Sequence, residues 1–188
     1  MQPRARLLVG NGPSFTFDAG SISMELLVSG GPEAYRKWEV WHTPQDLADW
    51  LGVDEVRLEA DDVDRFKDLR DTLWSVIPAV VEGRPVSPAA IETINGYARD
   101  APRPHLDPAS LSLSWSYTAS AILGAFARDA LELIGDPARR SRLRECSGHN
   151  CKLLFLDTSR PGNRRWCSME RCGNRNKVRS HRARRSGE

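Results

Sequence analysis

The residues best suited to chemistry in this chain are its four cysteines, all of which lie in the last quarter. They form two close pairs separated by a loop, Cys146-x₄-Cys151-x₁₅-Cys167-x₄-Cys172. Two such pairs can hold one Zn²⁺ from opposite sides, and four thiolates complete a tetrahedral shell that leaves no open position for catalysis. The segment is too short to fold on a hydrophobic core alone, so a metal would also explain its stability. We therefore predict one structural zinc ion with four cysteine ligands.

Two alternatives to this ligand set follow from the same segment. His149 lies between the first two cysteines and could replace one of them, although four thiols make it unnecessary. Disulfides would need an oxidising compartment. The start of the chain is basic but lacks the apolar stretch of a secretory signal, and no run approaches the roughly 20 apolar residues that cross a bilayer. We expect a cytoplasmic protein, in which paired cysteines are metal ligands.

Charge divides the chain into two parts. Residues 1–138 carry 12 Lys and Arg against 21 Asp and Glu, a balance of −9, whereas residues 139–188 carry 15 against 4, a balance of +11. Asymmetry of this size predicts an anionic partner for the basic part, above all nucleic acid. A solvated basic tail is the alternative. Some of the basic residues could also neutralise the zinc site itself, because a tetrathiolate zinc carries a charge of about −2.

The basic side chains concentrate around the second cysteine pair and in a helix expected from about Gly173 to Arg184. Within that helix Arg175, Arg179 and Arg182 share a face, a spacing suited to following a phosphate backbone. The candidate nucleic-acid contacts are Arg164, Arg165, Arg175, Lys177, Arg179, Arg182, Arg184 and Arg185. Trp166 is expected to pack against the zinc site rather than to stack on a base.

The elements that must position these residues predict an α+β protein. Residues 1–138 are expected to form one mainly helical domain with a small antiparallel sheet. Apolar periodicity and turn residues predict helices at 43–52, 61–82, 87–101 and 122–134, and strands at 15–17, 24–28 and a half-buried 111–115. A short basic helix that starts at Asp136-Pro137 leads to the first cysteine pair, a strand covers 153–157, and a helix supplies the last ligands. That order is typical of a treble-clef zinc finger.

The helical part contains no enzyme signature. It lacks a glycine-rich phosphate loop, a nucleophile elbow and a pair of histidines at metal-ligand spacing. Trp38, Trp41 and Trp50 are expected to belong to the core, with an aromatic ligand pocket as the alternative. No residues of a ligand pocket can be assigned, and the protein is not expected to be an enzyme.

The cysteine segment resembles a known family. Residues from Cys146 through Leu154-Phe155-Leu156-Asp157 and Arg164-Arg165-Trp166-Cys167 to Cys172-Gly173-Asn174-Arg175 are similar to the CGNR zinc finger, over about residues 143–185. Upstream, Phe15-x-Phe17-x₂-Gly20 and Thr43-Pro44-x-Asp46-Leu47-x₂-Trp50-Leu51 resemble landmarks of the ABATE domain. That family usually has Leu-Asp-Phe-x-Asn-Thr where this chain reads Met24-Glu25-Leu26-Leu27-Val28-Ser29, so the Asn-Thr pair is missing. The resemblance implies a bacterial, stress-induced transcription regulator.

Several functions are compatible with these observations. The first is a transcription regulator that binds DNA through the zinc finger and the basic helix, with residues 1–138 sensing a small-molecule effector or mediating assembly. RNA is a variant of that hypothesis, and a homodimer is expected because one finger covers little DNA. The second is a protein-interaction module in which zinc is a structural staple and the basic helix docks on an acidic surface. A nuclease is the third, but it would need histidines and an open metal position. No membrane association is expected.

Overall fold

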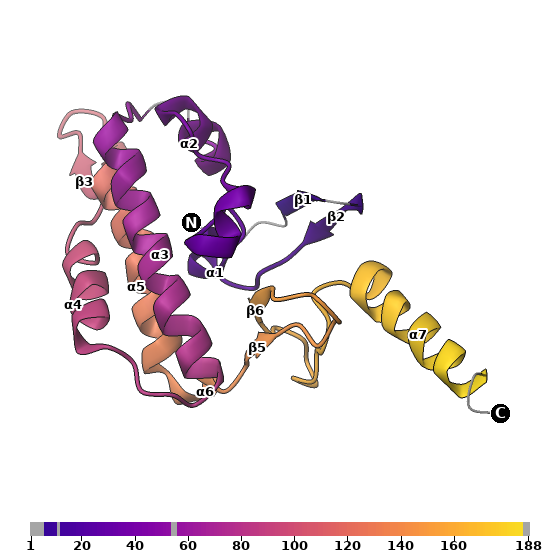
Figure 1. The fold of residues 1–188 in the computed structure, drawn as a ribbon. Helices are drawn as coiled ribbons and strands as arrows, with labels where there is room; N and C mark the ends of the chain where they lie inside the picture. Colours follow the sequence, from indigo (N-terminus) through magenta and orange to yellow (C-terminus); the bar gives the residue numbers. More distant parts are fainter. Residues whose placement is uncertain (1–5, 11, 54–55, 186–188) are drawn as a thin grey trace.

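Two long helices organise the body of the protein in the computed structural model, which describes residues 6–10, 12–53 and 56–185. They are α3 (Ala60–Val81) and α5 (Ala119–Gly135), and α4 (Pro88–Tyr97) packs against both (Figure 1). A reciprocal capping box between Glu59 and Asp62 begins α3, and Thr118 accepts a hydrogen bond from the N–H of Ala121 at the start of α5. The three helices confirm the periodicity of the sequence, and the fold is α+β as predicted.

The segment expected as a strand at 24–28 is instead the helix α1 (Ile22–Leu26). Every side chain from 21 to 27 is buried, so the segment has no exposed face and no periodicity that would separate a strand from a buried helix. The N–H of Ser23 donates to the Asp129 carboxylate at 2.9 Å, and the hydroxyls of Ser21 and Ser23 donate to the same oxygen. These bonds fix the start of α1 against α5.

A buried arginine joins α3 to the chain that precedes α2 (Pro44–Leu51). Arg70 is 2% exposed, and its two terminal nitrogens donate to the two carboxylate oxygens of Glu39 at 2.9 and 2.8 Å. Its guanidinium also lies 5.2 Å from the ring centre of Trp41. Of the three tryptophans expected in the core, Trp41 is fully buried and Trp50 is half-buried. Trp38 is exposed at the end of the 3-10 helix η1 (Glu33–Trp38), because that turn lies on the surface.

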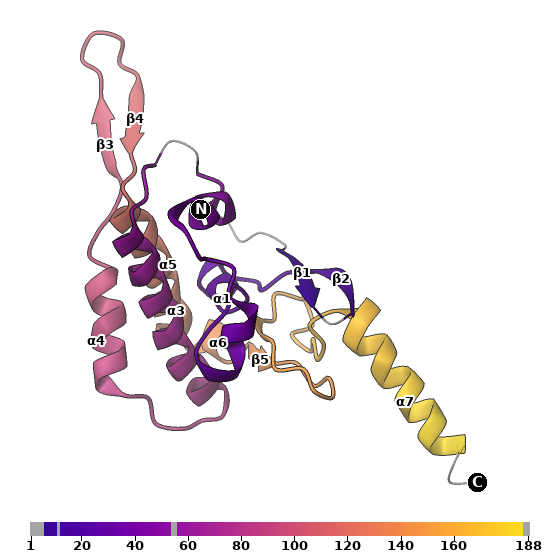
Figure 2. The same ribbon diagram turned by 45° about the horizontal axis from the view of Figure 1, so that its top comes forward.

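Three separate two-stranded antiparallel sheets complete the described part of the fold. The first joins β1 (Arg6–Gly10) to β2 (Gly12–Phe17), which includes the predicted strand at 15–17. The second joins β3 (Arg103–Leu106) to β4 (Leu113–Ser116). This β3–β4 hairpin projects from the helical body, as Figure 2 shows, so the expectation of a half-buried strand at 111–115 is wrong: β4 is exposed along its whole length.

The last part of the chain begins with α6 (Pro137–Arg140), β5 (Leu143–Glu145) and β6 (Leu154–Leu156). It ends with the π-helical turn η2 (Met169–Gly173) and α7 (Asn174–Arg185), which points away from the body (Figure 1). The hydrophobic core is continuous from the helices into the β5–β6 hairpin, where Phe155 is fully buried. Across the described ranges, none of the helices has the length and apolar character that crossing a membrane requires.

Candidate metal centre and nucleic-acid interface

The four cysteine sulfurs meet at one point between the β5–β6 hairpin and η2. All four lie within 4.8 Å of one another, and three of the cysteines are buried. The Cys151 and Cys167 sulfurs are 3.8 Å apart, and the Cys167 and Cys172 sulfurs are 3.5 Å apart. Four sulfurs at about 2.3 Å from a tetrahedral zinc ion stand about 3.8 Å from each other. The geometry therefore fits one structural Zn²⁺, and the exposed His149 is not a member of the cluster.

The first cysteine pair lies in the turn that joins β5 to β6. The backbone N–H of Cys146 donates to Leu153 at 2.9 Å and prolongs the hairpin, and the N–H of Cys151 donates to Gly148 at 3.0 Å and closes the turn. A Cβ on Gly148 would lie 2.8 Å from the Cys172 sulfur, so only glycine lets the turn approach the opposite ligand. The first cysteine pair is thus held inside the β5–β6 hairpin.

The second pair is positioned by the turn that precedes α7. The Ser168 hydroxyl accepts a hydrogen bond from the N–H of Arg171 at 3.4 Å, which caps η2. Cys172 lies near the end of η2, directly before α7 begins at Asn174. The last zinc ligand is therefore attached to the basic helix, so zinc binding and the position of α7 are coupled.

Hydrogen bonds link the sulfurs of the cluster and shift the pKa values of its thiols in different directions. Hydrogen bonds from Cys151 and Cys167 hold the pKa of Cys146 far below its ordinary value, and backbone N–H groups of Cys167 and Gly148 reach the same sulfur at 3.2 and 3.4 Å. The shared hydrogen bond with Cys146 raises the pKa of Cys151 to about 12. Because zinc needs thiolates, its binding must release the protons that remain, and zinc affinity falls as the pH falls.

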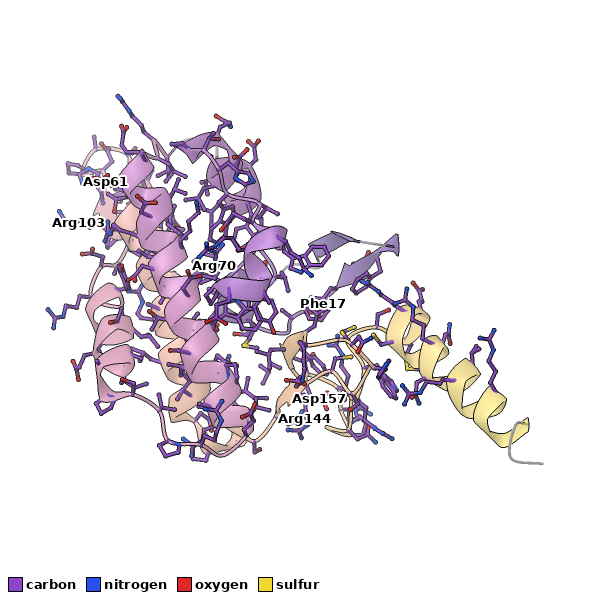
Figure 3. All side chains as sticks on the ribbon, viewed as in Figure 1. Phe17, Asp61, Arg70, Arg103, Arg144 and Asp157 are labelled. Atoms are coloured by element: carbon purple, nitrogen blue, oxygen red, sulfur yellow. The ribbon has the colours of Figure 1, made fainter. Side chains whose placement is uncertain are left out.

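A buried carboxylate shapes the loop between β6 and the second cysteine pair. Asp157 is fully buried and accepts hydrogen bonds from the Ser159 N–H at 2.9 Å, the Ser159 hydroxyl at 2.6 Å and the Arg164 N–H at 2.7 Å. Burial raises the pKa of Asp157, but these hydrogen bonds outweigh it and hold the pKa below its ordinary value. The carboxylate stays ionised and keeps the loop folded toward the zinc site (Figure 3).

The same loop fastens the finger to the helical domain. The guanidinium of Arg164 donates to the carbonyl oxygens of Trp166 at 3.0 Å, Cys167 at 2.6 Å and Asp18 at 3.1 Å. It also lies 4.3 Å from the ring centre of Phe155. One residue beyond Asp18, the carbonyl of Ala19 accepts a hydrogen bond from the Leu156 N–H at 2.9 Å. The finger is therefore docked directly against the segment that leads into α1.

These contacts change the role of one predicted nucleic-acid contact. The guanidinium of Arg164 is committed to three carbonyl oxygens and an aromatic ring, so it organises the finger rather than facing a ligand. Its neighbour Arg165 is exposed and lies 5.3 Å from the ring centre of Trp166. Trp166 is half-buried and packs beside Gly173, where it was expected. The sequence alone does not show that the side chains of Arg164 and Arg165 point in different directions.

The remaining basic candidates lie on α7. The side chains of Arg175, Lys177 and Arg179 are exposed and form no ion pair or hydrogen bond with another described residue. Arg182 is exposed as well. The side chains of Arg184 and Arg185 lie outside the described residues.

One cation that the sequence did not indicate also lies in this region. Arg171 is half-buried, and its guanidinium lies 4.4 Å from the ring centre of Phe15 in β2. No spacing rule connects residues so far apart in the chain. The contact joins the β1–β2 hairpin to the turn that carries Cys172.

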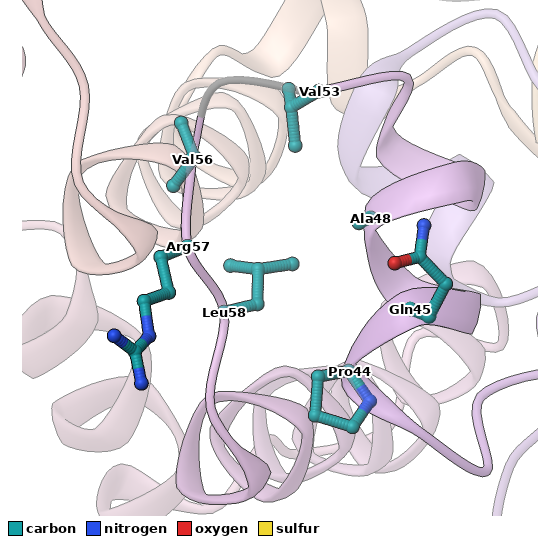
Figure 4. Close-up of a pocket in the computed structure, with 7 residues that line it drawn as sticks. All are labelled: Pro44, Gln45, Ala48, Val53, Val56, Arg57 and Leu58. Atoms are coloured by element: carbon teal, nitrogen blue, oxygen red, sulfur yellow. The ribbon is translucent and has the colours of Figure 1, made fainter.

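The described part of the helical domain contains an open hollow. It measures about 550 Å³ and lies between α2 and the segment that leads into α3 (Figure 4). Most of its lining residues are apolar, but the surface that they expose to the hollow is mainly polar. Arg57 belongs to the lining, and its guanidinium pairs with Glu59 at 2.7 Å. The lining residues are Pro44, Gln45, Ala48, Val53, Val56, Arg57 and Leu58.

Comparison with known proteins gives two matches that together cover most of the chain. The profile of the CGNR zinc finger matches residues 142–185. The ABATE profile, described as "Putative stress-induced transcription regulator", matches residues 20–137. No curated protein matches the chain. Neither matched family is described as an enzyme, and the order of the two matches agrees with the resemblance seen in the sequence.

Proposed function

The chain belongs to the ABATE family and carries a CGNR zinc finger, and we propose that it regulates transcription by binding nucleic acid through that finger. The observation that carries the proposal is α7, a basic helix that projects from the body next to the zinc site (Figure 1). The finger, from about residue 139 onward, is the binding part. Residues 1–138 form the regulatory part.

Electrostatics favours a polyanion as the ligand of α7. The helix carries six Lys and Arg and no acidic residue, and its described basic side chains on Arg175, Lys177 and Arg179 have no anionic partner among the described residues. A helix of 12 residues is about 18 Å long, which suits the major groove of a duplex. The acidic helical domain would be repelled by the same polyanion, so binding is directed to the finger.

Duplex DNA fits this surface better than single-stranded RNA. Single strands are usually held by aromatic rings on which bases stack. Trp166 packs against the finger beside Gly173, and the guanidinium of Arg165 lies over its ring. The candidate contacts therefore reduce to charged side chains, which suit phosphates on a regular duplex.

The helical domain is the place where a signal would act. The hollow beside α2 is the candidate site for a small-molecule effector, and the Asp18–Gly20 segment connects that domain to the finger through Arg164 and Leu156. The protein acts by binding rather than catalysis, because four thiolates leave zinc no open position. We expect it to work in the cytoplasm, where its regulatory target would lie.

A salt titration of binding to duplex DNA tests the proposal. If Arg165 and the six basic residues of α7 contact phosphates, log affinity should fall with log salt at a slope of about −6. Replacing Arg175 and Arg179 together with Ala should reduce the steepness of that slope by about 2. Arg99→Ala with Arg103→Ala, two exposed arginines of the helical domain, is the matched control and should leave the slope unchanged.

Competition with duplex RNA of the same sequence decides between the two nucleic acids. Stronger binding of the RNA duplex would overturn the preference for DNA. Absence of binding to either duplex at low salt, in protein with a full complement of zinc, would overturn the proposal and leave the protein-interaction module. In that case the separated finger and helical domain should bind each other.

A further inference from the structure

The β3–β4 hairpin has two different faces. In an antiparallel pair, residues opposite each other share a face, and alternate residues along a strand change face. The register therefore places Pro104 and Trp115 together with Leu106 and Leu113 on one face. The other face carries Arg103 and His105 from β3 and Ser114 and Ser116 from β4.

The apolar face is exposed. Leu106, Leu113 and Trp115 are 55%, 58% and 50% exposed, and Leu111 and Tyr117 beside them are 72% and 54% exposed. Most of the large exposed apolar side chains among the described residues belong to this one hairpin. A two-stranded hairpin alone is marginally stable in water, and three or more strands with an apolar face are needed for independent stability. The hairpin therefore lacks strands that would complete it.

The backbone shows which edge can accept those strands. The N–H of Asp107, the residue after β3, donates to the carbonyl of Ser112 at 2.9 Å, so these two backbone groups face each other across the hairpin. Because hydrogen-bonded pairs alternate along the ladder, the N–H and C=O groups of Leu113 and Trp115 point outward from β4. Pro104 occupies the equivalent outward position on β3 and has no N–H to donate. The β4 edge is open, and the β3 edge is blocked.

The open edge also lacks the charges that normally protect one. From Pro108 to Ala127 the sequence contains no Asp, Glu, Lys or Arg. The charged residues of the hairpin are Arg103 on β3 and Asp107, which directly follows β3. Natural edge strands are usually guarded by charged side chains or proline, and an unguarded edge pairs with another strand. Two uncharged β4 edges can approach each other without repulsion.

We infer that β4 is a homodimerisation strand, which pairs antiparallel with β4 of a second copy to form a four-stranded sheet. With a two-fold axis beside Ser114, Leu113 of each copy lies opposite Trp115 of the other copy. Both residues of β4 whose backbone groups point outward then have a partner. Each such pair exchanges two backbone hydrogen bonds, and leucine packs across the strands against tryptophan. The two apolar faces join into one surface. This inference goes beyond nucleic-acid binding and does not depend on it.

Ser114 provides the test, since the axis would place it opposite its own copy. A directly opposed pair of this kind has Cα atoms about 4.5 Å apart, a separation that a disulfide spans. The variant Ser114→Cys in the zinc-loaded full chain should form a cross-linked dimer on mild oxidation. The control Ser116→Cys lies on the same strand and face but would stand opposite Ser112 of the second copy, so it should remain reduced.

A charge at the same position gives a second, independent readout. Wild-type protein should be dimeric by sedimentation equilibrium, and Ser114→Asp should raise the dimer dissociation constant at least about tenfold by opposing like charges. The control Ser116→Asp should change it little. Both serines are exposed, so neither aspartate should unfold the domain.

Three results would overturn the inference. They are a wild-type chain that is monomeric at all concentrations, a dimer that Ser114→Asp leaves intact, and equal cross-linking of the two cysteine variants. A monomer would assign the β4 edge to a strand from another protein. The inference and the proposed function fail separately. A monomer that binds DNA would overturn only the dimer, whereas a dimer that does not bind DNA would overturn only the proposed function.

Discussion

Two adjacent arginines, Arg164 and Arg165, should differ sharply in their effect on stability. Replacing Arg164 with Ala removes three hydrogen bonds from a charged donor, to the carbonyls of Trp166, Cys167 and Asp18. It also removes the contact with the Phe155 ring at 4.3 Å. Hydrogen bonds to charged groups contribute about 1.5–3 kcal/mol each, and a cation over a ring about 0.5–2 kcal/mol.

The expected cost is smaller than the sum of these contributions. The carbonyls can bind water once the side chain is gone, above all that of the exposed Asp18. We expect Arg164→Ala to lower the free energy of unfolding by about 3–5 kcal/mol. Arg165→Ala removes one exposed contact with Trp166 and should cost about 0.5–1 kcal/mol.

Urea unfolding at saturating zinc measures both values. Arg164→Lys keeps the charge without the planar fork, so it should remain clearly less stable than the wild type. At temperatures where both variants are folded, Arg165→Ala should bind DNA more weakly than Arg164→Ala does. Equal unfolding free energies for Arg164→Ala and Arg165→Ala would refute this assignment of roles.

Three further outcomes are expected. Removal of zinc by a chelator, or Cys172→Ser, should unfold residues 140–188 and leave the far-ultraviolet signal of the upstream helices; a thiol titration that finds two disulfides and no metal would contradict this. Gly148→Ala should weaken zinc binding at least about tenfold, because the added methyl would lie 2.8 Å from the Cys172 sulfur. Competition with a zinc indicator measures this affinity, and Gly135→Ala, where the added methyl meets no other atom, is the control. Burial raises the pKa of Glu39, but hydrogen bonds from Arg70 and the Trp41 N–H outweigh it, so the folded-state pKa lies below the ordinary value. The ionised carboxylate therefore stabilises the fold above the unfolded pKa, and this contribution is lost as the pH falls through the folded pKa. Glu39→Gln should be less stable at neutral pH and should lose less stability on acidification, as unfolding midpoints across that range would show.

The zinc site and the long helices could be predicted from the sequence because each rests on a short-range pattern. Cysteine spacing indicates a tetrahedral shell, and the apolar positions of α3 recur at the helical period. Both kinds of pattern are complete within one segment of the chain. The positive net charge of residues 139–188 also follows directly from the sequence.

The features that the sequence did not predict depend on contacts between distant segments. The segment of α1 was expected to be a strand, because its helical form depends on packing against α5, which is distant in the sequence. Asp129 of α5 accepts the hydrogen bond from the Ser23 N–H. β3 was not expected because Pro104 argues against a strand, and only pairing with β4 shows that this proline lies at an outer edge. Arg164 was grouped with the ligand-facing cations because its direction depends on Asp18.

The bonds between the finger and the segment before α1 have a consequence for how a signal could travel. The backbone of Ala19 holds β6, and two residues later Ser21 begins the contact with Asp129 of α5. A Cβ on Gly20 would lie 2.4 Å from the Leu156 carbonyl, so the two chains touch without room for adjustment. The ABATE domain and the zinc finger are therefore in direct contact at this point. If α5 shifted, these contacts would pass the movement to the finger and change the direction of α7. Under the proposed function, the fit of α7 to a duplex would then depend on the position of α5.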